Sequence, residues 1–315
     1  MACTLVIGFV FVDIKGFPLG KYNVRGRNLG NVSFIHGGVS RNVAENIAGC
    51  GAPVAFASLT EDSALGNDVV KRLNARGVDT SAMRTVESAG IGQWMVILDE
   101  RGDVAGEISC PPSVDELIAL MRERGDELVS ACGNIVLEID CSPELDELVL
   151  ALAKKYNKPV YTVVGNMSVI LSHREYLAAL DCFICNEVEA GQLFGEDLST
   201  HTPDEMLGVL SENITSIGCN SMVVTMGSKG AVYYDTKNDV SGFAPAIPTK
   251  LVDSTGAGDA FLSGTVVGLS SGMPLGEAVK VGTLLASRTI QTSESTAEPD
   301  ANILADFTEE FQVSY

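Results

Sequence analysis

Hydrophobic and polar positions follow two different patterns along this chain. From about residue 134 onward, short apolar runs alternate with amphipathic segments whose spacing fits helices. We predict strands at 134–139, 159–164, 181–185 and 221–225. We predict helices at 143–156, 172–180 and 203–217. This alternation is typical of a parallel sheet with helices on both faces.

The N-terminal third has a different pattern, in which apolar and polar side chains alternate one by one. Three segments show it, at 31–35, 93–99 and 104–108. Such half-exposed strands do not belong inside a doubly wound sheet, so we expect a small second sheet, a lid inserted from about 13–35 and 91–109. No repeat or linker divides the chain, and we expect one domain over 1–315 with a short helix at 301–311.

The start of the chain is apolar over residues 4–12, which predicts a first buried strand. This run is too short to cross a bilayer and has no basic leader, so we expect a soluble, cytoplasmic protein without a membrane partner. Eight cysteines in a chain of this length do not indicate a disulfide framework. Cys182 and Cys185 lack a second pair for a zinc site, which favours buried thiols in a reducing cytosol.

Composition and charge narrow the range of partners. Hydrophobic residues make up 46% of the 315 residues and charged residues 20%, as expected of a globular protein. The 21 Lys and Arg stand against 41 Asp and Glu, a net charge of -20, which argues against a nucleic acid polymer as partner. A small anion remains compatible, because backbone N–H groups can hold phosphate inside an acidic protein.

The run from Asp253 to Asp259, Asp-Ser-Thr-Gly-Ala-Gly-Asp, offers chemistry. A strand-like run ends before it and a helix of small residues follows, so Asp259 is expected at a helix N-terminus. Unpaired N–H groups there, with the helix dipole, can stabilise a transferring phosphoryl group, and Asp259 can accept a proton from an attacking hydroxyl. The alternative is an ordinary acidic residue in a first helical turn, behind a glycine turn.

This segment resembles the second signature of the ribokinase-like, or PfkB, carbohydrate kinases. His36 to Ala44, His-Gly-Gly-Val-Ser-Arg-Asn-Val-Ala, is similar to the first signature of that family. The resemblance implies a substrate site and a phosphoryl-transfer site. The substrate residues would be Asp13, Gly37, Gly38, Arg41 and Asn42, and the transfer residues would be Gly256, Ala257, Gly258 and Asp259. Asn42 taken alone could equally be a core or capping amide.

Two further motifs resemble the nucleotide site of the same family. Asn186 and Glu189 match an Asn-x-x-Glu element that implies ATP phosphates and Mg²⁺ held through water, although the same spacing is that of a capping box. Thr225, Gly227 and Gly230 match a loop that lies along ATP, although a hairpin turn explains the glycines as well.

The same resemblance places adenine near residues 281–285 and a monovalent cation such as K⁺ beside Asp253 and Thr255. It implies a ribokinase-like α/β fold, a mainly parallel doubly wound sheet flanked by helices with a small β-sheet lid. We therefore expect an ATP-dependent kinase. Neither a Gly-x-x-x-x-Gly-Lys-Ser/Thr loop nor a dinucleotide fingerprint is present.

The segment from Gly37 to Asn46 is most similar to the pseudouridine kinase branch, which implies phosphorylation of the primary hydroxyl of pseudouridine. Leu29-Gly30-Asn31 and Val164-Gly165 depart from that branch, so another nucleoside or a free sugar such as ribose remains the alternative. A catalytically silent binding protein of the same fold is a third interpretation. The resemblance also implies a homodimer through the lid, for which Trp94, Val96 and Leu98 are candidate contacts unless they face the ligand.

Overall fold

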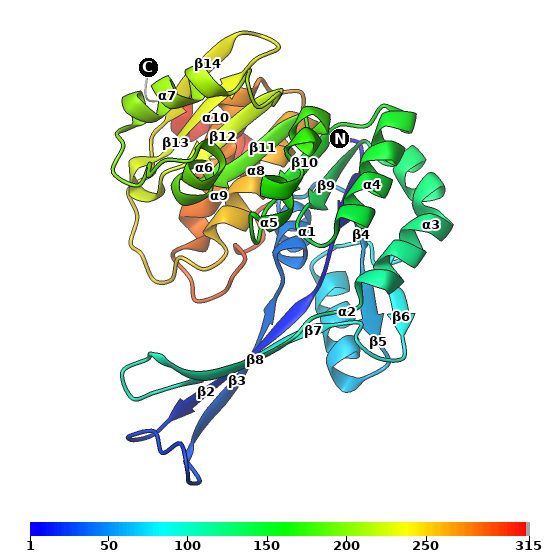
Figure 1. Ribbon diagram of the computed structural model, residues 1–315, viewed down its shortest axis with the longest axis vertical. Coiled ribbons are helices and arrows are strands. Elements are labelled where there is room, and N and C mark those ends of the chain that lie inside the picture. Colours follow the sequence, from blue (N-terminus) through cyan, green and yellow to red (C-terminus); the bar gives the residue numbers. More distant parts are fainter. Residues whose placement is uncertain (313–315) are drawn as a thin grey trace.

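An eight-stranded sheet forms the centre of the computed structural model, which describes residues 1–312 (Figure 1). In spatial order its strands are β14 (Val240–Ala244), β13 (Ala231–Asp235), β12 (Ser221–Thr225), β11 (Cys182–Asn186), β10 (Val160–Val163), β9 (Asn134–Glu138), β1 (Thr4–Ile7) and β4 (Val54–Ala57). The strands from β12 to β4 are parallel, and β13 and β14 add an antiparallel edge. The predicted, mainly parallel sheet is confirmed, including all four strands predicted after residue 134.

Helices cover both faces of this sheet (Figure 1). On one face lie α3 (Val114–Ala131), α4 (Pro143–Tyr156), α5 (Ser168–Ser172), α6 (Glu187–Phe194) and α7 (Pro203–Asn213). On the other lie α1 (Val39–Gly49), α8 (Ala257–Ser270) and α9 (Leu275–Thr289). Beside these are β5 (Leu59–Glu61), α2 (Ala64–Ala75), β6 (Arg84–Val86), α10 (Ile303–Gln312) and two 3₁₀ helices, Arg174–Ala179 and Gly227–Lys229.

The helix predictions hold with two corrections. The helix predicted at 143–156 is confirmed with the same bounds, and α10 confirms the short helix near the C-terminus. The helix predicted at 203–217 ends at Asn213. The helix predicted at 172–180 is wrong, because His173 leaves the helical region (φ −131°, ψ 60°) and separates α5 from a 3₁₀ helix.

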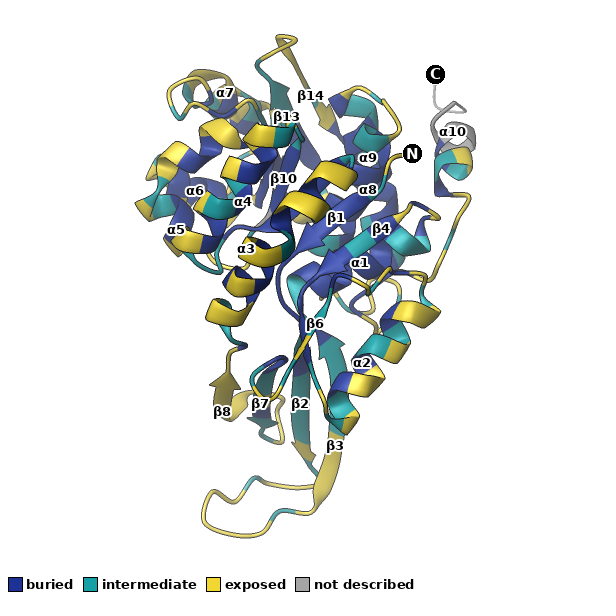
Figure 2. Cartoon of the chain, turned by 90° about the vertical axis from the view of Figure 1, so that its right-hand side faces the viewer, coloured by how far each residue is buried: buried dark blue, intermediate teal, exposed yellow. Residues whose placement is uncertain are grey.

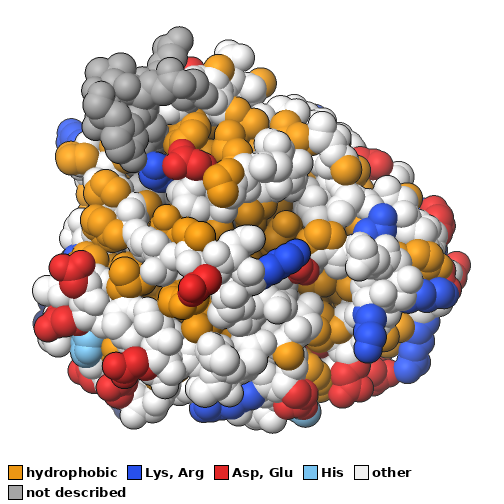
Figure 3. Space-filling view, turned by 90° about the horizontal axis from the view of Figure 1, so that it is seen from above, with side chains coloured by type: hydrophobic (Ala, Val, Ile, Leu, Met, Phe, Trp, Pro, Cys, Tyr) orange, Lys and Arg blue, Asp and Glu red, His pale blue; other side chains and the backbone are white. Residues whose placement is uncertain are grey.

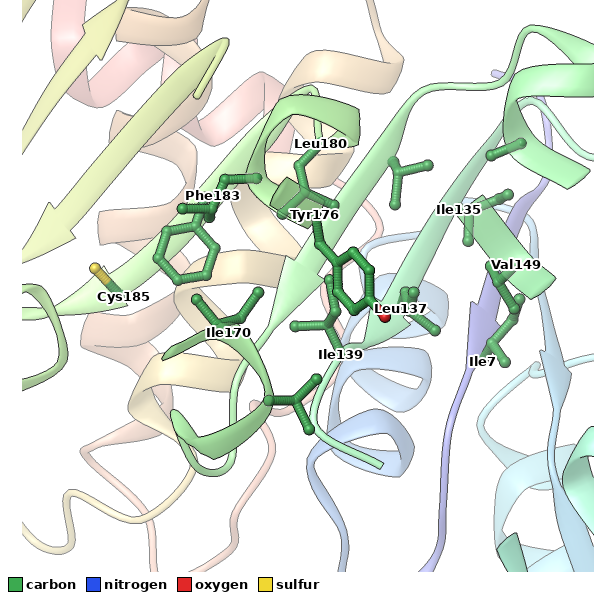
Figure 4. Packing of buried hydrophobic residues seen from close by; sticks show 14 of the residues in the cluster. Ile7, Ile135, Leu137, Ile139, Val149, Ile170, Tyr176, Leu180, Phe183 and Cys185 are labelled. Atoms are coloured by element: carbon green, nitrogen blue, oxygen red, sulfur yellow. The ribbon is translucent and has the colours of Figure 1, made fainter. Parts of the chain in front are cut away.

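The core consists of two apolar layers, one on each face of the central sheet. Successive residues of a strand point to opposite faces, so Leu5 and Ile7 join the layer under α3–α7, whereas Val6 joins the layer under α1, α8 and α9. Figure 4 shows the first layer, with Ile7, Leu137 and Phe183 of the strands packed against Val149 and Ile170 of the helices. This packing fixes the strand ends that carry the site.

A four-stranded sheet projects from this body as an arm (Figure 1). Its strands, in the order β3, β2, β7, β8, are Gly30–Gly37, Phe11–Pro18, Gly92–Leu98 and Val104–Cys110. The prediction of one strand over 4–12 is therefore wrong. Central pairing with β4 and β9 ends at Ile7, and from Phe11 the chain pairs instead with β3 and β7. The predicted small second sheet is present, and Figure 2 shows exposed chain at its tip.

The arm sheet has one face toward the body's cavity and one face away from it. Asp13, Ile35 and Trp94 stand opposite one another across the strands and line the cavity. Val96 and Leu98 share that face by the two-residue period, and Val96 is buried, so these side chains are not the exposed dimer contacts considered above. Four exposed apolar side chains, of Val32, Phe34, Met95 and Ile108, and the half-buried Ile14 belong to the other face, which we call the outer lid face.

The surface carries charges of both signs, and the cysteines are unpaired. On the face shown in Figure 3, Lys and Arg side chains are interspersed with Asp and Glu. Within residues 1–312, no helix combines the length and apolar character needed to cross a membrane. All eight cysteines are free thiols, and Cys182 and Cys185 are buried.

Candidate active site

A cavity of about 400 Å³ lies between the arm sheet and the N-termini of α1 and α8. Eight of the residues predicted from sequence line it: Asp13, Gly37, Gly38, Asn42, Asp253, Thr255, Gly256 and Asp259. These residues come from segments far apart in the chain, and the structure brings them together. The cavity thus joins residues of both signature segments, those expected to hold the substrate and those expected to carry out phosphoryl transfer.

Asp259 lies in the first turn of α8, as predicted. Gly256 precedes the helix with φ 79°, and a β-carbon there would overlap the carbonyl oxygen of Ser295, so only glycine fits. The Nδ2 of Asn42 donates to Asp259 Oδ2 at 2.6 Å. Burial raises the pKa of Asp259 to about 7, while the bond from Asn42 and the charge of Arg41 oppose that rise. The carboxylate is therefore poised to exchange a proton near neutral pH.

The Gly-Gly turn brings α1 close to Asp13. Gly38 has φ 94°, and a β-carbon there would lie 2.8 Å from the backbone of Phe9 and of Phe11. At Gly37 a β-carbon would lie 3.2 Å from Asp13 Oδ1. Burial raises the pKa of Asp13, and the charges of Lys15 and Arg41 oppose it. The turn leaves backbone atoms and the Asp13 carboxylate at the wall of the cavity.

Arg41 does not face the cavity, which corrects its predicted role in substrate binding. Its side chain is completely buried, and Nη1 donates to Glu45 Oε2 at 2.6 Å. Nε donates to the carbonyl of Gly37 at 3.2 Å. Residue 41 is on α1 one position before Asn42, so the 100° step between helical neighbours turns it away from the substrate side.

The Asn186–Glu189 pair lies at a second hollow, outside the cavity of Asp259. Asn186 Oδ1 accepts from the N–H of Glu189 at 2.9 Å, and Glu189 Oε2 accepts from the N–H of Asn186 at 2.8 Å. The capping box is therefore real, as the alternative interpretation held. Both side chains nevertheless line the second hollow, with Gly165, Asn166 and Gln192. Thr225 stands opposite Asn186 in the β11–β12 pair.

The glycines after Thr225 have structural explanations. Gly227 has φ 55° at the start of a 3₁₀ turn. Gly230 has φ 107°, and a β-carbon there would overlap the carbonyl oxygen of Ala244 in the hairpin. The side chains of Val281 and Leu285 are buried in the second apolar layer, and the position of adenine near residues 281–285 stays a prediction.

The loop before α8 uses some of its polar atoms internally. The N–H of Ala257 donates to the carbonyl of Ser254 at 3.2 Å. Asp253 Oδ1 accepts from the N–H of Thr255 at 2.9 Å and from its hydroxyl at 2.8 Å. These bonds hold the pKa of Asp253 below its usual value. Among the predicted anion-binding N–H groups, that of Ala257 is therefore already engaged by the turn.

Two charged cavity residues, Glu138 and Lys15, were not predicted from the sequence, and the side of the sheet to which Trp94 points had been left open. Glu138 ends β9, and its Oε2 accepts from Ser40 Oγ at 2.6 Å and from the N–H of Phe9 at 3.1 Å. Burial, with the nearby charge of Asp140, raises the pKa of Glu138 to about 7. A carboxylate at the C-terminal end of a central parallel strand was the available signal, because ligands of open α/β sheets bind there.

Comparison with known proteins gives the class of the molecule. Residues 1–302 match the pfkB family of carbohydrate kinases. The chain is 33% identical over 295 residues to guanosine-inosine kinase of Exiguobacterium acetylicum, covering 94% of this chain and 96% of that protein. It is 26% identical over 299 residues to pseudouridine kinase of Escherichia coli (strain K12), covering 95% and 93%. The chain belongs to the pfkB family and is a phosphotransferase, a sugar or nucleoside kinase.

The fold agrees with this class. Arabidopsis thaliana ribokinase, solved in complex with ribose and ATP, has a TM-score of 0.81 to this chain at 22% identity, covering 97% of this chain and 98% of that one. The expected ribokinase-like fold is confirmed. The mostly parallel central sheet, its flanking helices and the small arm sheet are thus features of that fold.

Proposed function

We propose that this kinase transfers the γ-phosphate of ATP to the primary 5′-hydroxyl of a nucleoside. The observation that carries the proposal is the position of Asp259, which lies at the start of α8 and lines the cavity that the arm sheet covers. The reaction needs a proton acceptor and an anion site within reach of one hydroxyl. We assign the first role to Asp259 and the second to the N–H groups of Gly256 and Gly258.

In the proposed reaction the substrate hydroxyl oxygen attacks the γ-phosphorus while Asp259 accepts the hydroxyl proton. The bond from the γ-phosphorus to the β–γ bridging oxygen breaks, and ADP leaves with those electrons. The N–H groups of Gly256 and Gly258 face the charge that develops on the phosphoryl oxygens. Asp13, Gly38 and Asn42 orient the sugar, and the arm sheet keeps water out.

Mg²⁺ bound with ATP would neutralise phosphate charge, and Asn186 and Glu189 fit it through water, since both line the second hollow. Glu189 Oε2 is used by the capping box, which leaves the second carboxylate oxygen for such a contact. Asp253 and Thr255 are proposed to lie beside a monovalent cation such as K⁺. Thr225, Gly227 and Gly230 are proposed to follow the nucleotide. The cytoplasm would supply both ions and ATP.

Guanosine or inosine is the first acceptor to test, and pseudouridine is the second. Support for the purine nucleosides comes from the 33% identity to guanosine-inosine kinase, against 26% to pseudouridine kinase. The similarity of residues 37–46 to the pseudouridine kinase branch supports the second acceptor. Trp94, Phe11 and Ile35 give the cavity an apolar wall on which a nucleobase can stack, which free ribose would leave unused.

A coupled assay of ADP release tests the proposal across guanosine, inosine, pseudouridine, uridine and ribose, with MgATP. We expect a nucleoside to give kcat/KM at least tenfold above ribose. Higher activity with ribose would contradict the nucleoside assignment and leave a sugar kinase. No ADP release with any acceptor would favour the catalytically silent interpretation.

We also propose a homodimer that covers the outer lid face. Phe34 is 62% exposed and Val32 65% on the edge strand β3, and Ile108 is 69% exposed on the other edge strand, β8. Ile14 and Met95 lie between Phe34 and Ile108 in one row across the sheet. Exposed apolar area of this kind on a projecting sheet is typical of an interaction surface. A second copy of the chain is the proposed occupant, since two such faces are self-complementary.

A further inference from the structure

A chain of buried polar contacts leads from α1 to the carboxylate of Asp259. Arg41 Nη2 lies 3.3 Å from Ser295 Oγ, and Ser295 Oγ lies 3.4 Å from Asn42 Oδ1. Asn42 Nδ2 lies 2.6 Å from Asp259 Oδ2. Arg41 is completely buried, Asn42 is 5% exposed and Ser295 is 7% exposed. These side chains are thus held in a region from which water is largely excluded.

The donors in this chain can be assigned a direction. A guanidinium only donates, so Arg41 donates to Ser295 Oγ. The single hydroxyl proton of Ser295 has two acceptors in reach, Asn42 Oδ1 and the carbonyl of His36 at 3.3 Å. Because the Asn42 amide donates to Asp259 through its NH₂ group, its Oδ1 is the atom that faces Ser295 and accepts from the hydroxyl. That bond turns the amide so that its NH₂ group faces Asp259.

Arg41 and the segment that carries Ser295 are both held by contacts with Glu45. Glu45 is 2% exposed, pairs with Arg41 at 2.6 Å, and also pairs with Arg72 at 2.9 Å and Arg76 at 3.2 Å. Thr296, the neighbour of Ser295, donates to Glu45 Oε1 at 3.2 Å. The segment that carries Ser295 is therefore bound to the same buried cluster as Arg41, and Ser295 cannot move without breaking it.

We propose that Ser295 and Arg41 are positioning residues that act through Asn42 to hold Asp259 ionised and correctly oriented as the proton acceptor. The proposal rests on the proposed function for the role of Asp259. Neither residue takes part in the transfer itself. Their effect is to keep the Asn42 amide as a donor, since the flipped amide would present its oxygen to the carboxylate and favour the protonated acid.

Several charged groups face Asp259, and Arg41 differs from the others. Glu138 of β9, Asp13 of β2 and Asp253 of the preceding loop line the same cavity and disfavour a further negative charge. Lys15 of β2 is the cation on the arm side. Arg41 is the buried cation on the body side, and its charge lowers the pKa of Asp259 against the effect of burial. The hydrogen bond from Asn42 lowers the pKa of Asp259 as well, so loss of the link from Arg41 through Ser295 to Asn42 should favour protonation of Asp259.

The test is the pH dependence of kcat/KM with MgATP and the most active acceptor of the nucleoside panel. At low pH, protonation of Asp259 should lower kcat/KM, and we call this part of the profile the acid limb. For Ser295→Ala we expect the midpoint of the acid limb to rise by about 0.5–1 pH units, the scale of one lost hydrogen bond. The rate should then fall roughly 3–10-fold on the acid limb and change little at pH 9. Ser295→Thr keeps the hydroxyl and should keep the wild-type limb. An unmoved limb in Ser295→Ala, with or without a uniform loss of rate, would overturn the proposal.

Two controls separate this effect from a structural one. Ser287→Ala removes another buried hydroxyl, which donates only to the carbonyl of Leu284 at 2.7 Å on α9, and should not move the limb. The shift should persist in a Glu138→Gln background, because Glu138 is the other cavity carboxyl with a pKa of about 7. A shift that disappears there would assign the limb to Glu138 and contradict the proposal. Arg41→Lys supplies the same comparison if Ser295→Ala does not fold.

A double-mutant cycle by urea unfolding tests the coupling without any activity. At pH 9, where Asp259 is ionised, Ser295→Ala should lower the unfolding midpoint more in the wild-type background than in Asp259→Asn. Equal effects in the two backgrounds would overturn the proposal. If no acceptor is phosphorylated, the proposed function fails while this cycle still decides whether Ser295 acts on Asp259.

Discussion

Replacing Asp259 by asparagine should separate catalysis from folding. The variant keeps the size of the side chain and an oxygen that can accept from Asn42, but it cannot accept the substrate proton. Loss of a positioned general base costs about 10²–10⁴ in turnover, and we expect kcat to fall by that factor with KM for ATP little changed.

The same substitution should raise stability at alkaline pH. Burial raises the pKa of Asp259 from 3.8 to about 7, which makes its ionised form roughly 4 kcal/mol less favourable in the folded protein, as an upper limit. The folded state holds this proton more tightly than the unfolded chain, so wild type loses stability as pH rises from about 4 through 7. Asp259→Asn lacks this loss, and its advantage should be largest at pH 8.

Steady-state kinetics and urea unfolding at pH 5 and pH 8 measure both effects. Asp115→Asn is a matched control, because Asp115 is an exposed acidic residue in the first turn of α3, away from the cavity. It should keep full activity and lose only the small stabilisation that a first-turn carboxylate provides. Wild-type turnover in Asp259→Asn, or equal losses of turnover in the two variants, would refute the assignment and leave Asp259 as a capping residue.

Three further predictions concern the cavity wall, the core and the arm. Trp94→Ala should raise KM for the nucleoside about tenfold, the scale of one lost aromatic contact, whereas Trp94→Phe should change KM little. Unchanged kinetics in Trp94→Ala would contradict a stacking role for Trp94. Asp146 is completely buried, neither carboxylate oxygen has a hydrogen-bond partner, and burial raises its pKa from 3.8 to about 8. Wild type should therefore lose stability as pH rises from about 4 to 8 while Asp146→Asn loses less, as urea unfolding can measure. Phe34→Asp on the outer lid face should convert a dimer to a monomer in sedimentation velocity, with Asp103→Asn at the arm's turn as control; a wild-type monomer would contradict the dimer.

The parts of the fold that follow from side-chain period were predictable. β9, β11 and β12 are continuous apolar runs because both their faces are covered, and α4 carries a serine cap and Pro143 at its start. The break between β1 and β2 was not predictable, because residues 4–12 stay apolar across it. The partner strands change there, and pairing is a property of the folded chain.

The site shows the same division. The Gly-Gly turn and the run before Asp259 have glycines at positive φ, a local requirement that sequence records. The directions in which the side chains of Arg41 and Trp94 point depend on tertiary packing. Arg41 points into the buried cluster with Glu45, and Trp94 points into the cavity. Glu138 and Ser295 belong to the site because of contacts between residues far apart in the chain. Glu138 bonds Ser40 across 98 residues, and Ser295 bonds Asn42 across 253 residues.

Identification of the phosphorylated product tests the central claim most directly. The protein would be incubated with MgATP and guanosine or inosine, and the product examined by ³¹P NMR and mass spectrometry, with Asp259→Asn alongside. We predict a nucleoside 5′-monophosphate and ADP in equal amounts, far slower product formation by the variant, and no product from the 5′-deoxy nucleoside. Phosphate at another position, product from the 5′-deoxy compound, or ADP formed without a phosphorylated acceptor would contradict the account.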